Sequence, residues 1–248
     1  MYNPFSLCNK TIFITGASSG IGRATAIECS KLGAKIIITG RDNNRLQQTF
    51  TELDGDGHMQ FLADLTISDS LQAIVSELPK IDGFVCNAGI IEKKPIKFIK
   101  DENLQKVLSI NSIVPIMLTK HLVKSKKLKN PSSVVYVSSI AGTENVSMGN
   151  SVYSASKGAL HGFMKNAALE LASKGVRCNS VNPGIITTKL LENTKLSSDQ
   201  VEELRMRYPL KRFGNPRDVA LAIIYLLSDA AAWVTGSALL IDGGFTLH

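Results

Sequence analysis

The sequence predicts an α/β fold in which one doubly wound, parallel, seven-stranded sheet carries helices on both faces. Short apolar runs rich in β-branched residues alternate with longer helical stretches, which is the pattern of strands joined by crossover helices. A glycine-rich turn follows the first apolar run and opens a helix. The 248 residues are 44% hydrophobic and hold no linker, internal repeat or low-complexity segment, so we expect one domain over residues 1–248.

Strands are expected where an apolar, β-branched run lies between turn residues. In the first part of the chain these runs are residues 10–15, 35–39, 59–62 and 81–86. Helices are expected between them, over residues 21–32, 43–53 and from about residue 66 to residue 78. Thr66, with Asp69 three residues later, is the expected cap of the third helix.

The second part of the chain continues the alternation. We expect a long helix over 101–127 that Pro115 kinks, strands at 133–138, 176–181 and 238–241, and helices at 152–173 and 216–227. Gly175 is expected to end the helix before it. Residues 185–210 have weak periodicity and many polar side chains, which predicts a substrate lid of short helices.

The glycine-rich turn has the spacing G-x-x-x-G-x-G at Gly16, Gly20 and Gly22. Such glycines let the backbone approach a phosphate, and the following helix N-terminus offers free N–H groups and a positive dipole. A glycine-rich loop alone is as often a plain turn, but the strand and helix around this one favour a pyrophosphate site. We therefore predict a dinucleotide cofactor.

The end of the second strand bears on which dinucleotide is bound. NAD sites usually place an acidic side chain here for the ribose 2′-hydroxyl. The chain has Arg41, whose guanidinium suits a 2′-phosphate, so NADP(H) is favoured. Asp42, one residue later, leaves NAD(H) open as the alternative. Gly16, Arg41, Asp64 and Asn87 all fall at strand ends, where ligands of parallel sheets bind.

Tyr153 and Lys157 lie four residues apart in the predicted helix 152–173, so both project from one helix face. A nearby ammonium lowers the pKa of a phenol, which is ordinarily about 10. A tyrosine tuned in this way exchanges a proton near neutral pH. Most Tyr/Lys pairs at this spacing are solvated helix surface, so the interpretation depends on the rest of the chain.

The composition argues against several classes of protein. The net charge is +7, but the densest basic run, residues 124–129, is short and has no aromatic residue, so no nucleic-acid partner is expected. The four cysteines and four histidines have neither metal-ligand nor disulfide spacing, so we expect no metal site and a reducing compartment. With no signal peptide and no apolar run of about 20 residues, we expect a cytoplasmic protein without membrane contact.

Five motifs together resemble the short-chain dehydrogenase/reductase family over residues 11–244. In the family's order and spacing the chain carries T-G-A-S-S-G-I-G (15–22), N-A-G (87–89), S-S-I-A-G (138–142), Y-S-A-S-K (153–157) and N-P-G (182–184). The family's usual N-N-A-G begins with Cys86 here, which we expect to be a buried strand residue. The resemblance implies a single-domain Rossmann fold and an active NAD(P)-dependent oxidoreductase.

The resemblance implies four catalytic residues. Tyr153 would be the general acid that protonates the carbonyl oxygen, and Lys157 would lower its pKa and hold the nicotinamide ribose. Ser139, rather than Ser138, would orient the carbonyl and stabilise its developing charge. Asn111 would hold a water in a proton relay to Lys157.

The resemblance also implies cofactor contacts along the same motifs. Asp64 and Leu65 would touch the adenine, the N-A-G motif the adenosine side, and Ile186 and Thr188 the nicotinamide end. The complete implied set is Gly16, Ser18, Ser19, Gly20, Ile21, Gly22, Arg41, Asp64, Leu65, Asn87, Ala88, Gly89, Tyr153, Lys157, Pro183, Gly184, Ile186 and Thr188.

Within the family, the whole-chain pattern is most similar to 3-oxoacyl-[acyl-carrier-protein] reductases. This implies NADPH-dependent reduction of a ketone to a secondary alcohol, in fatty acid biosynthesis. The alternatives are another carbonyl substrate, such as a sugar, a steroid or a small secondary alcohol, and a non-catalytic nucleotide-binding protein.

The resemblance implies two kinds of protein partner. Acyl carrier proteins are acidic, which makes a group of lysines a candidate docking surface. These are Lys124, Lys126, Lys127, Lys129 and Lys174. The family also implies a homotetramer that pairs the Asn111 and Tyr153 helices across subunits.

Overall fold

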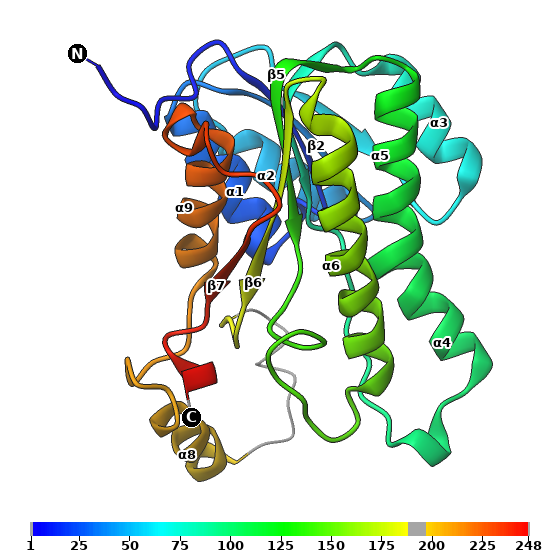
Figure 1. The fold of residues 1–248 in the computed structure, drawn as a ribbon, viewed down its shortest axis with the longest axis vertical. Helices are drawn as coiled ribbons and strands as arrows, with labels where there is room; N and C mark the ends of the chain where they lie inside the picture. Colours follow the sequence, from blue (N-terminus) through cyan, green and yellow to red (C-terminus); the bar gives the residue numbers. More distant parts are fainter. Residues whose placement is uncertain (1, 188–196, 248) are drawn as a thin grey trace.

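Seven strands form one parallel sheet in the computed structural model, which describes residues 2–187 and 197–247 of the chain. The order across the sheet is β3-β2-β1-β4-β5-β6-β7, and every neighbouring pair is parallel (Figure 1). The strands are β1 (Thr11–Thr15), β2 (Lys35–Gly40), β3 (Met59–Leu62), β4 (Ile81–Cys86), β5 (Leu128–Val137), β6 (Val176–Pro183) and β7 (Ala238–Ile241). The strand order reverses between β1 and β4, where such sheets bind ligands. The predicted doubly wound α/β class is confirmed.

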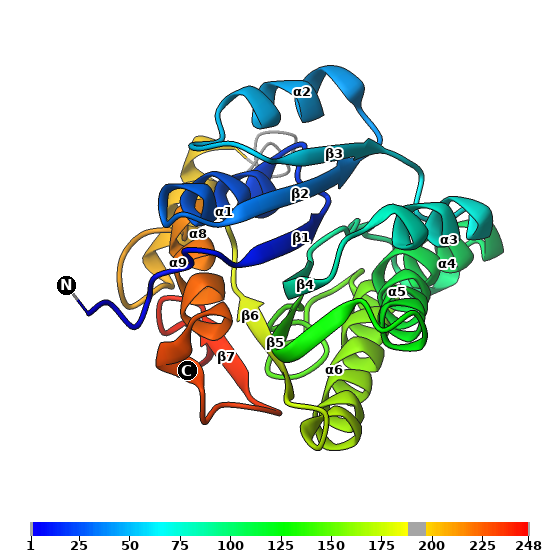
Figure 2. The same ribbon diagram turned by 90° about the horizontal axis from the view of Figure 1, so that it is seen from above.

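Helices cover both faces of the sheet, as Figure 2 shows. One face carries α1 (Gly20–Lys31), α2 (Asn43–Thr51) and α9 (Pro216–Leu227). The other carries α3 (Ser68–Glu77), α4 (Asp101–Leu108), α5 (Val114–Lys124) and α6 (Ser151–Ala172). Short 3₁₀ helices are η1 (Ile96–Phe98), η3 (Asp229–Ala231) and η4 (Phe245–Leu247).

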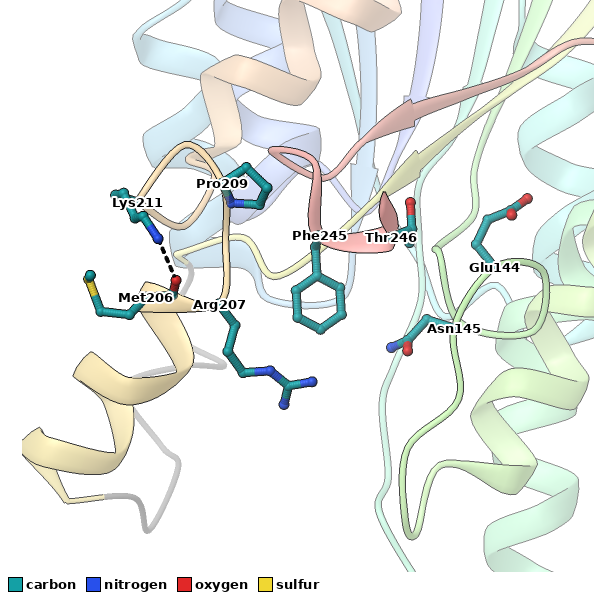
Figure 3. A pocket seen from close by; sticks show the side chains of 8 residues that line it. All are labelled: Glu144, Asn145, Met206, Arg207, Pro209, Lys211, Phe245 and Thr246. Carbon is teal, nitrogen blue, oxygen red and sulfur yellow. Dashed lines mark hydrogen bonds between the residues drawn. The ribbon is translucent and has the colours of Figure 1, made fainter. Parts of the chain in front are cut away.

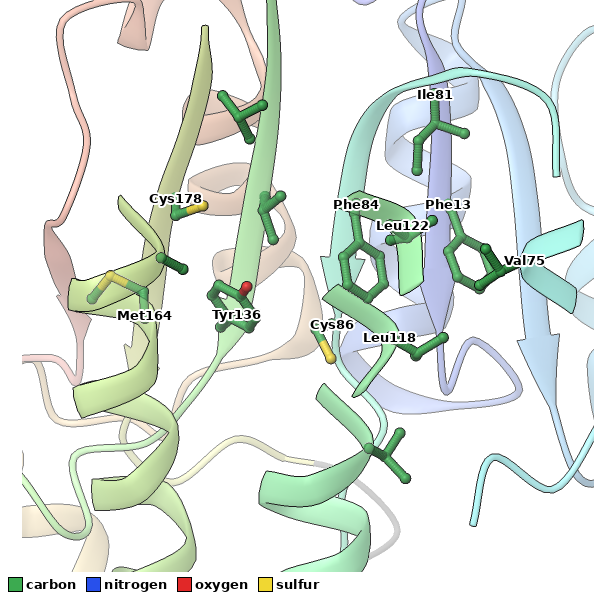
Figure 4. Close-up of a cluster of buried hydrophobic side chains, with 14 of the residues drawn as sticks. Phe13, Val75, Ile81, Phe84, Cys86, Leu118, Leu122, Tyr136, Met164 and Cys178 are labelled. Atoms are coloured by element: carbon green, nitrogen blue, oxygen red, sulfur yellow. The ribbon is translucent and has the colours of Figure 1, made fainter. Parts of the chain in front are cut away.

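The alternation of side chains along β1 produces the two cores. Phe13 points into the core beneath α3, α5 and α6, while Ile12 and Ile14 point into the core beneath α1 and α9. Figure 4 shows part of the first core, where the ring of Phe13 stacks on Phe84 with 5.5 Å between centroids. Because both faces of the strands are buried, the strands are continuous apolar runs in the sequence.

Most predicted elements agree with the structure to within two residues. The bounds of β3, β4, β7 and α9 are those predicted, and β6 continues two residues further, to Pro183. Strand β5 begins at Leu128 instead of residue 133, because Leu128 pairs with Ile81 before a register irregularity. The lysine, asparagine and proline of that first part have low strand propensity, which is why the sequence did not indicate it.

The long helical stretch predicted over 101–127 is present from Asp101 to Lys124, but its interruption differs from the one expected at Pro115. Helix α4 ends at Leu108, and a π-helical turn, η2 (Ser109–Ile113), joins it to α5. Pro115 lies in the first turn of α5, directly after this π-helical turn. The cap predicted for the third helix is wrong, because Ile67 is the N-cap and the Thr66 hydroxyl donates to Asp64 instead.

The region expected to be a lid contains one described helix, α8 (Ser198–Met206), whose N-terminus has a capping box of Ser197 and Gln200. Residues 188–196, including Thr188, lie outside the described residues. In the described ranges, no helix has the length and apolar character needed to cross a membrane. All four cysteines are free thiols, with Cys86 buried as expected, and the cytoplasmic location stays a prediction.

Candidate active site

The glycine-rich loop between β1 and α1 presses its backbone against the end of β4. Gly16 has φ +65° and Gly20 has φ +56°, in the left-handed region that favours glycine. A Cβ on Gly16 would lie 2.8 Å from the Cα of Ala88, and a Cβ on Gly22 would overlap the Asn87 amide and the Gly16 carbonyl. The loop therefore takes this close path only with glycine at these positions.

Thr15 and Asn87 hold this loop in place. The Thr15 hydroxyl accepts hydrogen bonds from the backbone N–H groups of Asn87 (3.0 Å) and Ala88 (3.1 Å). The Asn87 amide donates to the carbonyl groups of Thr15 (2.9 Å) and Gly16 (3.1 Å). Asn87 is thus a brace between β1 and β4, and its predicted contact with the adenosine stays a prediction. The sequence reasoning did not select Thr15, although it opens the first motif.

The N-terminus of α1 has the features of an anion site. Ser19 is its N-cap, but the Ser19 side chain makes no capping hydrogen bond. The first N–H groups of a helix have no partner within the helix, and they carry the positive end of its dipole. These are the amides of the segment that contains Gly20, Ile21 and Gly22. Ser18 packs beside Gly40 at the end of β2, so the loop bridges two strand ends. The fit to a dinucleotide pyrophosphate is good.

Arg41 and Asp42 differ in how they are engaged. The Asp42 carboxylate caps α2 by accepting from Arg45 N (3.0 Å) and pairs with Arg45 Nε (2.7 Å). The backbone hydrogen bond from Arg45 is the main cause that lowers the pKa of Asp42. Arg41 is 56% exposed, and its nearest carboxylate oxygen, in Asp64, is 3.9 Å away. The cation at this strand end is therefore available to a ligand, while the acid is already bonded.

Asp64 and Leu65 follow β3 at the same edge of the sheet. The Asp64 carboxylate accepts from the backbone and hydroxyl of Thr66, and the hydroxyl's hydrogen bond is the main cause that lowers the Asp64 pKa. The Leu65 side chain is buried in the core, so a ligand would meet only its backbone.

Ser139, Tyr153 and Lys157 meet where β5 ends beside α6. The Ser139 side chain lies close enough to Tyr153 to lower the pKa of its hydroxyl, and Ser139 Oγ accepts from Ala141 N (3.1 Å). The Lys157 ammonium lies 5.8 Å from the centre of the Tyr153 ring and donates to the Val137 carbonyl (2.8 Å). Ser138 instead turns toward the Lys157 carbonyl, at 3.4 Å. The structure thus brings Ser139, not Ser138, to the tyrosine.

Burial sets the pKa values of this pair. Desolvation raises the pKa of Tyr153, and the hydrogen bond with Ser139 opposes that rise. The net pKa of Tyr153 thus lies above its ordinary value, and the lowering effect expected of Lys157 stays a prediction. Desolvation also lowers the pKa of Lys157 to about 8, so the ammonium keeps its charge at neutral pH.

Asn111 is fully buried in the π-helical turn and connects three segments. Its Oδ1 accepts from Ile90 N (2.9 Å), and its Nδ2 donates to Ile90 O (2.9 Å) and Ser156 Oγ (3.0 Å). These contacts use the polar atoms of the side chain, and the proton-relay role stays a prediction. A Cβ on Gly89 would lie 3.2 Å from Asn111 Oδ1 and 3.6 Å from Lys157 Nζ, so the N-A-G motif passes directly beside both residues. Sequence reasoning missed Ser156, although it lies within Y-S-A-S-K.

The N-P-G motif at the end of β6 adjoins the Ser139 turn. The Pro183 carbonyl accepts from Ile140 N (3.2 Å), and Gly184 N donates to the carbonyl of Ile241 at the end of β7 (3.1 Å). Ile186 pairs with Gly214 in an isolated bridge. Pro183, Gly184 and Ile186 thus lie at the same edge of the sheet as the predicted cofactor site.

A pocket of about 430 Å³ opens beside this edge (Figure 3). Its walls come from the turn after Ser139, the segment after α8 and the C-terminal 3₁₀ helix. The lining residues are Glu144, Asn145, Met206, Arg207, Pro209, Lys211, Phe245 and Thr246. Across the described part of the chain, no cluster of three or more potential metal ligands occurs.

Comparisons with known proteins agree with this geometry. The family model described as enoyl-(acyl carrier protein) reductase matches residues 16–246. The 3-oxoacyl-[acyl-carrier-protein] reductase FabG of Rickettsia felis is 34% identical over 97% of this chain and 98% of its own length. A glucose 1-dehydrogenase of Gluconobacter oxydans is 31% identical over 96% of this chain and 92% of its own.

Solved structures are similar over the whole chain. A putative NAD(P)-dependent gluconate 5-dehydrogenase of Beutenbergia cavernae, with bound NADP at low occupancy, has a TM-score of 0.89 and 28% identity, covering 99% of this chain and 100% of its own. A putative 2-deoxy-D-gluconate 3-dehydrogenase of Agrobacterium tumefaciens, with bound NADP, has a TM-score of 0.88 and 27% identity, covering 100% of each chain. With its motifs, its fold and a family model that spans nearly its full length, the chain belongs to the short-chain dehydrogenase/reductase family.

Proposed function

We propose that the chain is an NADPH-dependent oxidoreductase that reduces a ketone to a secondary alcohol, and that the ketone is a 3-oxoacyl group carried by acyl carrier protein. The observation that carries the proposal is the grouping of Ser139 and Tyr153 beside the Lys157 ammonium. It lies at the carboxyl ends of the strands, at the same edge as the braced glycine loop.

Two features of the cofactor site support NADP(H) over NAD(H). Arg41 presents an exposed guanidinium, which suits a 2′-phosphate, while Asp42 is bonded to Arg45 and caps α2. The glycine loop and the N-terminus of α1 would hold the pyrophosphate. When bound, the cofactor supplies the hydride that adds to the carbonyl carbon.

The chain's own residues supply the proton and the electrostatics. Ser139 and Tyr153 would donate hydrogen bonds to the carbonyl oxygen of the substrate. These bonds would stabilise the negative charge that develops on that oxygen. Tyr153 would then give its proton to that oxygen, and its phenolate would be stabilised by the Lys157 ammonium. In the reverse oxidation, Tyr153 would take the alcohol proton. Asn111 and Ser156 would position helix α6, which carries Tyr153 and Lys157.

Two observations favour an acyl substrate over a sugar. The 3-oxoacyl-[acyl-carrier-protein] reductase of Rickettsia felis is 34% identical to this chain, against 31% for the glucose 1-dehydrogenase of Gluconobacter oxydans. Exposed apolar side chains also lie along the turn after Ser139 and around the segment after α8. They are Val146 (85% exposed), Met148 (95%), Met206 (48%) and Leu210 (66%). An apolar chain would find partners here that a sugar would not use.

The lysine group does not support carrier docking beside this site. Lys127 Nζ donates to the carbonyl groups of Ser76 and Leu78, and Lys129 Nζ pairs with Asp82 at 2.8 Å. Lys124, Lys126 and Lys174 are exposed, but they precede β5 and β6, at the opposite edge of the sheet from Ser139 (Figure 1). Binding of the carrier at the chain's own pocket would therefore depend on other residues.

The proposal also includes a homotetramer. Helix α6 carries an exposed stripe that includes Ala155, Ala159, Gly162 and Leu169, and Leu169 is 80% exposed. These positions share one helix face. This face of small and apolar residues, which also includes Asn166, suits packing against a second copy of the chain.

The experiment follows NADPH consumption by the purified protein with acetoacetyl and 2-butenoyl thioesters, sugars and sugar acids, beside a Tyr153→Phe variant. We expect turnover of the acetoacetyl thioester and its loss by roughly 10²- to 10⁴-fold in the variant, with NADPH affinity retained. Equal activity of the variant would contradict the mechanism. Binding of NADPH without turnover of any ketone would favour the non-catalytic alternative, and reduction of the 2-butenoyl group instead would place the reaction at a C=C bond.

A further inference from the structure

The pocket of about 430 Å³ beside the Ser139 turn contains one arginine whose charge no described acid balances. Arg207 is exposed on the wall formed after α8, and its guanidinium lies 5.4 Å from the centre of the Phe245 ring. Figure 3 shows it reaching from that wall toward the turn with Glu144 and Asn145. In residues 2–187 and 197–247, Arg207 makes no ion pair.

The other basic side chains near this wall are already engaged. Arg205 pairs with Glu202, and Arg212 pairs with Asp218 at 2.6 Å. Lys211 lines the same pocket, but its Nζ donates to the Met206 carbonyl at 2.9 Å, as the dashed line in Figure 3 shows. Lys211 keeps two further N–H donors, but among the described residues Arg207 is the cation on this wall whose side chain makes neither a hydrogen bond nor an ion pair.

The pocket adjoins the reacting groups through two connections. The backbone N–H groups of Glu144 and Asn145 both donate to Ile140 O at 2.9 Å, so the opposite wall is a tight turn that begins at Ser139. The buried Tyr208, next to Arg207, accepts from Ile185 N at 3.1 Å, which ties the arginine's segment to the N-P-G end of β6. The pocket that contains Arg207 thus adjoins the turn that follows Ser139 and the segment that follows β6.

We propose that Arg207 binds an anionic group of the substrate, a carboxylate or a phosphate, so that the enzyme prefers an anionic ketone to a neutral one of the same shape. The proposal rests on the proposed ketone reduction at Ser139 and Tyr153. It specifies in addition that the ketone substrate carries a negative charge. The Phe245 ring beneath the guanidinium limits its freedom and leaves its edge for a bidentate contact. Glu144, across the pocket, would repel the same anion and set where it binds.

The two sources of such a group are a free oxo acid and the phosphate of a carrier's pantetheine arm. The test compares methyl ketones that end in a carboxylate, with increasing chain length from 4-oxopentanoate, with their methyl esters. A third arm compares acetoacetyl-phosphopantetheine with the neutral acetoacetyl N-acetylcysteamine thioester. The variants are Arg207→Met, Arg207→Lys and Glu144→Gln, with Lys174→Met as a charge-matched control at the opposite edge of the sheet.

For Arg207→Met we expect KM to rise roughly 10- to 100-fold for the anionic substrates, with KM for the neutral partners and kcat little changed. For Arg207→Lys we expect a smaller rise of KM for the anionic substrates than for Arg207→Met. Glu144→Gln should lower KM for the anionic substrates. Lys174→Met should change KM for neither the anionic nor the neutral substrates. A preference within the carboxylate series or for the phosphopantetheine thioester identifies the source of the anion. An equal rise for charged and neutral substrates, or no rise, would overturn the proposal.

A binding measurement separates this proposal from the proposed function. Calorimetric titration of 4-oxopentanoate and its longer homologues into protein saturated with NADP⁺ needs no turnover. Weaker binding to Arg207→Met than to the wild type would support the anion site even if no ketone is reduced. Equal binding to both proteins would reject it even if reduction is observed.

Discussion

Arg41 and Asp42 are neighbours in the sequence with different roles in the structure. Removing the Arg41 guanidinium should raise the Kd for NADPH roughly 10- to 100-fold and leave the Kd for NADH unchanged, because a charge-assisted contact with the 2′-phosphate is lost. Asp42→Ala should instead lower the free energy of unfolding by about 1 kcal/mol, because α2 loses its N-cap. Fluorescence titration with both nucleotides and urea unfolding measure these effects. Loss of NADH binding in Asp42→Ala alone would show that Asp42, not Arg41, contacts the ribose.

Lys157 should make stability depend on pH in a defined direction. Burial lowers its pKa from an ordinary value of 10.5 to about 8, so between these values the unfolded chain holds a proton that the folded chain has released. The free energy of unfolding therefore rises with pH through this window and is lowest, for this group, below pH 8. The total gain is at most about 3 kcal/mol.

Urea unfolding of the wild type and Lys157→Met, at pH values on both sides of that window, measures the effect. Other titrating groups are common to both proteins and largely cancel in the difference. We expect the free energy of unfolding of the wild type, relative to that of the variant, to rise with pH. A fall of this difference with pH would mean that the fold stabilises the ammonium more than water does.

At the scale of elements, the π-helical turn η2 carries Asn111, whose side chain bonds to Ile90 and Ser156. Asn111→Ala would leave the N–H and C=O of Ile90 without these partners in a partly buried site, at about 2 to 4 kcal/mol of unfolding free energy. Ser156→Ala removes two neutral hydrogen bonds, one from Asn111 and one to the Tyr153 carbonyl, and should cost about 1 to 2 kcal/mol. Urea unfolding compares the two variants. A smaller loss for Asn111→Ala than for Ser156→Ala would contradict this account of the turn.

The elements that the sequence predicted well are those whose signal is local. The runs that form β3, β4 and β7 are apolar and end at turn residues, and α9 begins with Pro216. The π-helical turn has no such signal, because it depends on contacts of Asn111 with Ile90 and Ser156, which are distant in sequence. The first part of β5 was missed for the same reason, since pairing with Ile81 holds residues of low strand propensity.

The candidate site divides in the same way. Motif residues such as Tyr153 and Lys157 were identified because their spacing and order are visible in the chain. Thr15 was missed because its role is to hold the N–H groups of a loop that follows another strand. The net rise of the Tyr153 pKa could not be predicted, because the spacing in a helix gives proximity to Lys157 but says nothing about burial.

At the scale of the whole molecule, the parallel sheet decides which residues cooperate. Because all strands point the same way, the glycine loop after β1, Arg41 after β2, the N-A-G motif after β4 and Ser139 after β5 share one edge. The exposed lysines before β5 and β6 lie at the other edge for the same reason. The lysine group considered as a docking surface for acyl carrier protein is thus separated from the site by the length of the sheet.

Gly162, on the exposed face of α6, allows a direct test of the proposed tetramer. A Cβ built on Gly162 meets nothing within 4 Å, so a longer side chain fits the isolated chain, and replacing a helical glycine adds helix propensity. In a tetramer that packs α6 closely against a partner, the same side chain would hold the helices apart. Gly162→Gln should therefore fold with stability equal to or above the wild type yet assemble less, while Asn44→Gln on α2 should assemble as the wild type does. Light scattering measures the mass of each, and a monomeric wild type, or a Gly162→Gln variant with unchanged mass, would reject the α6 interface.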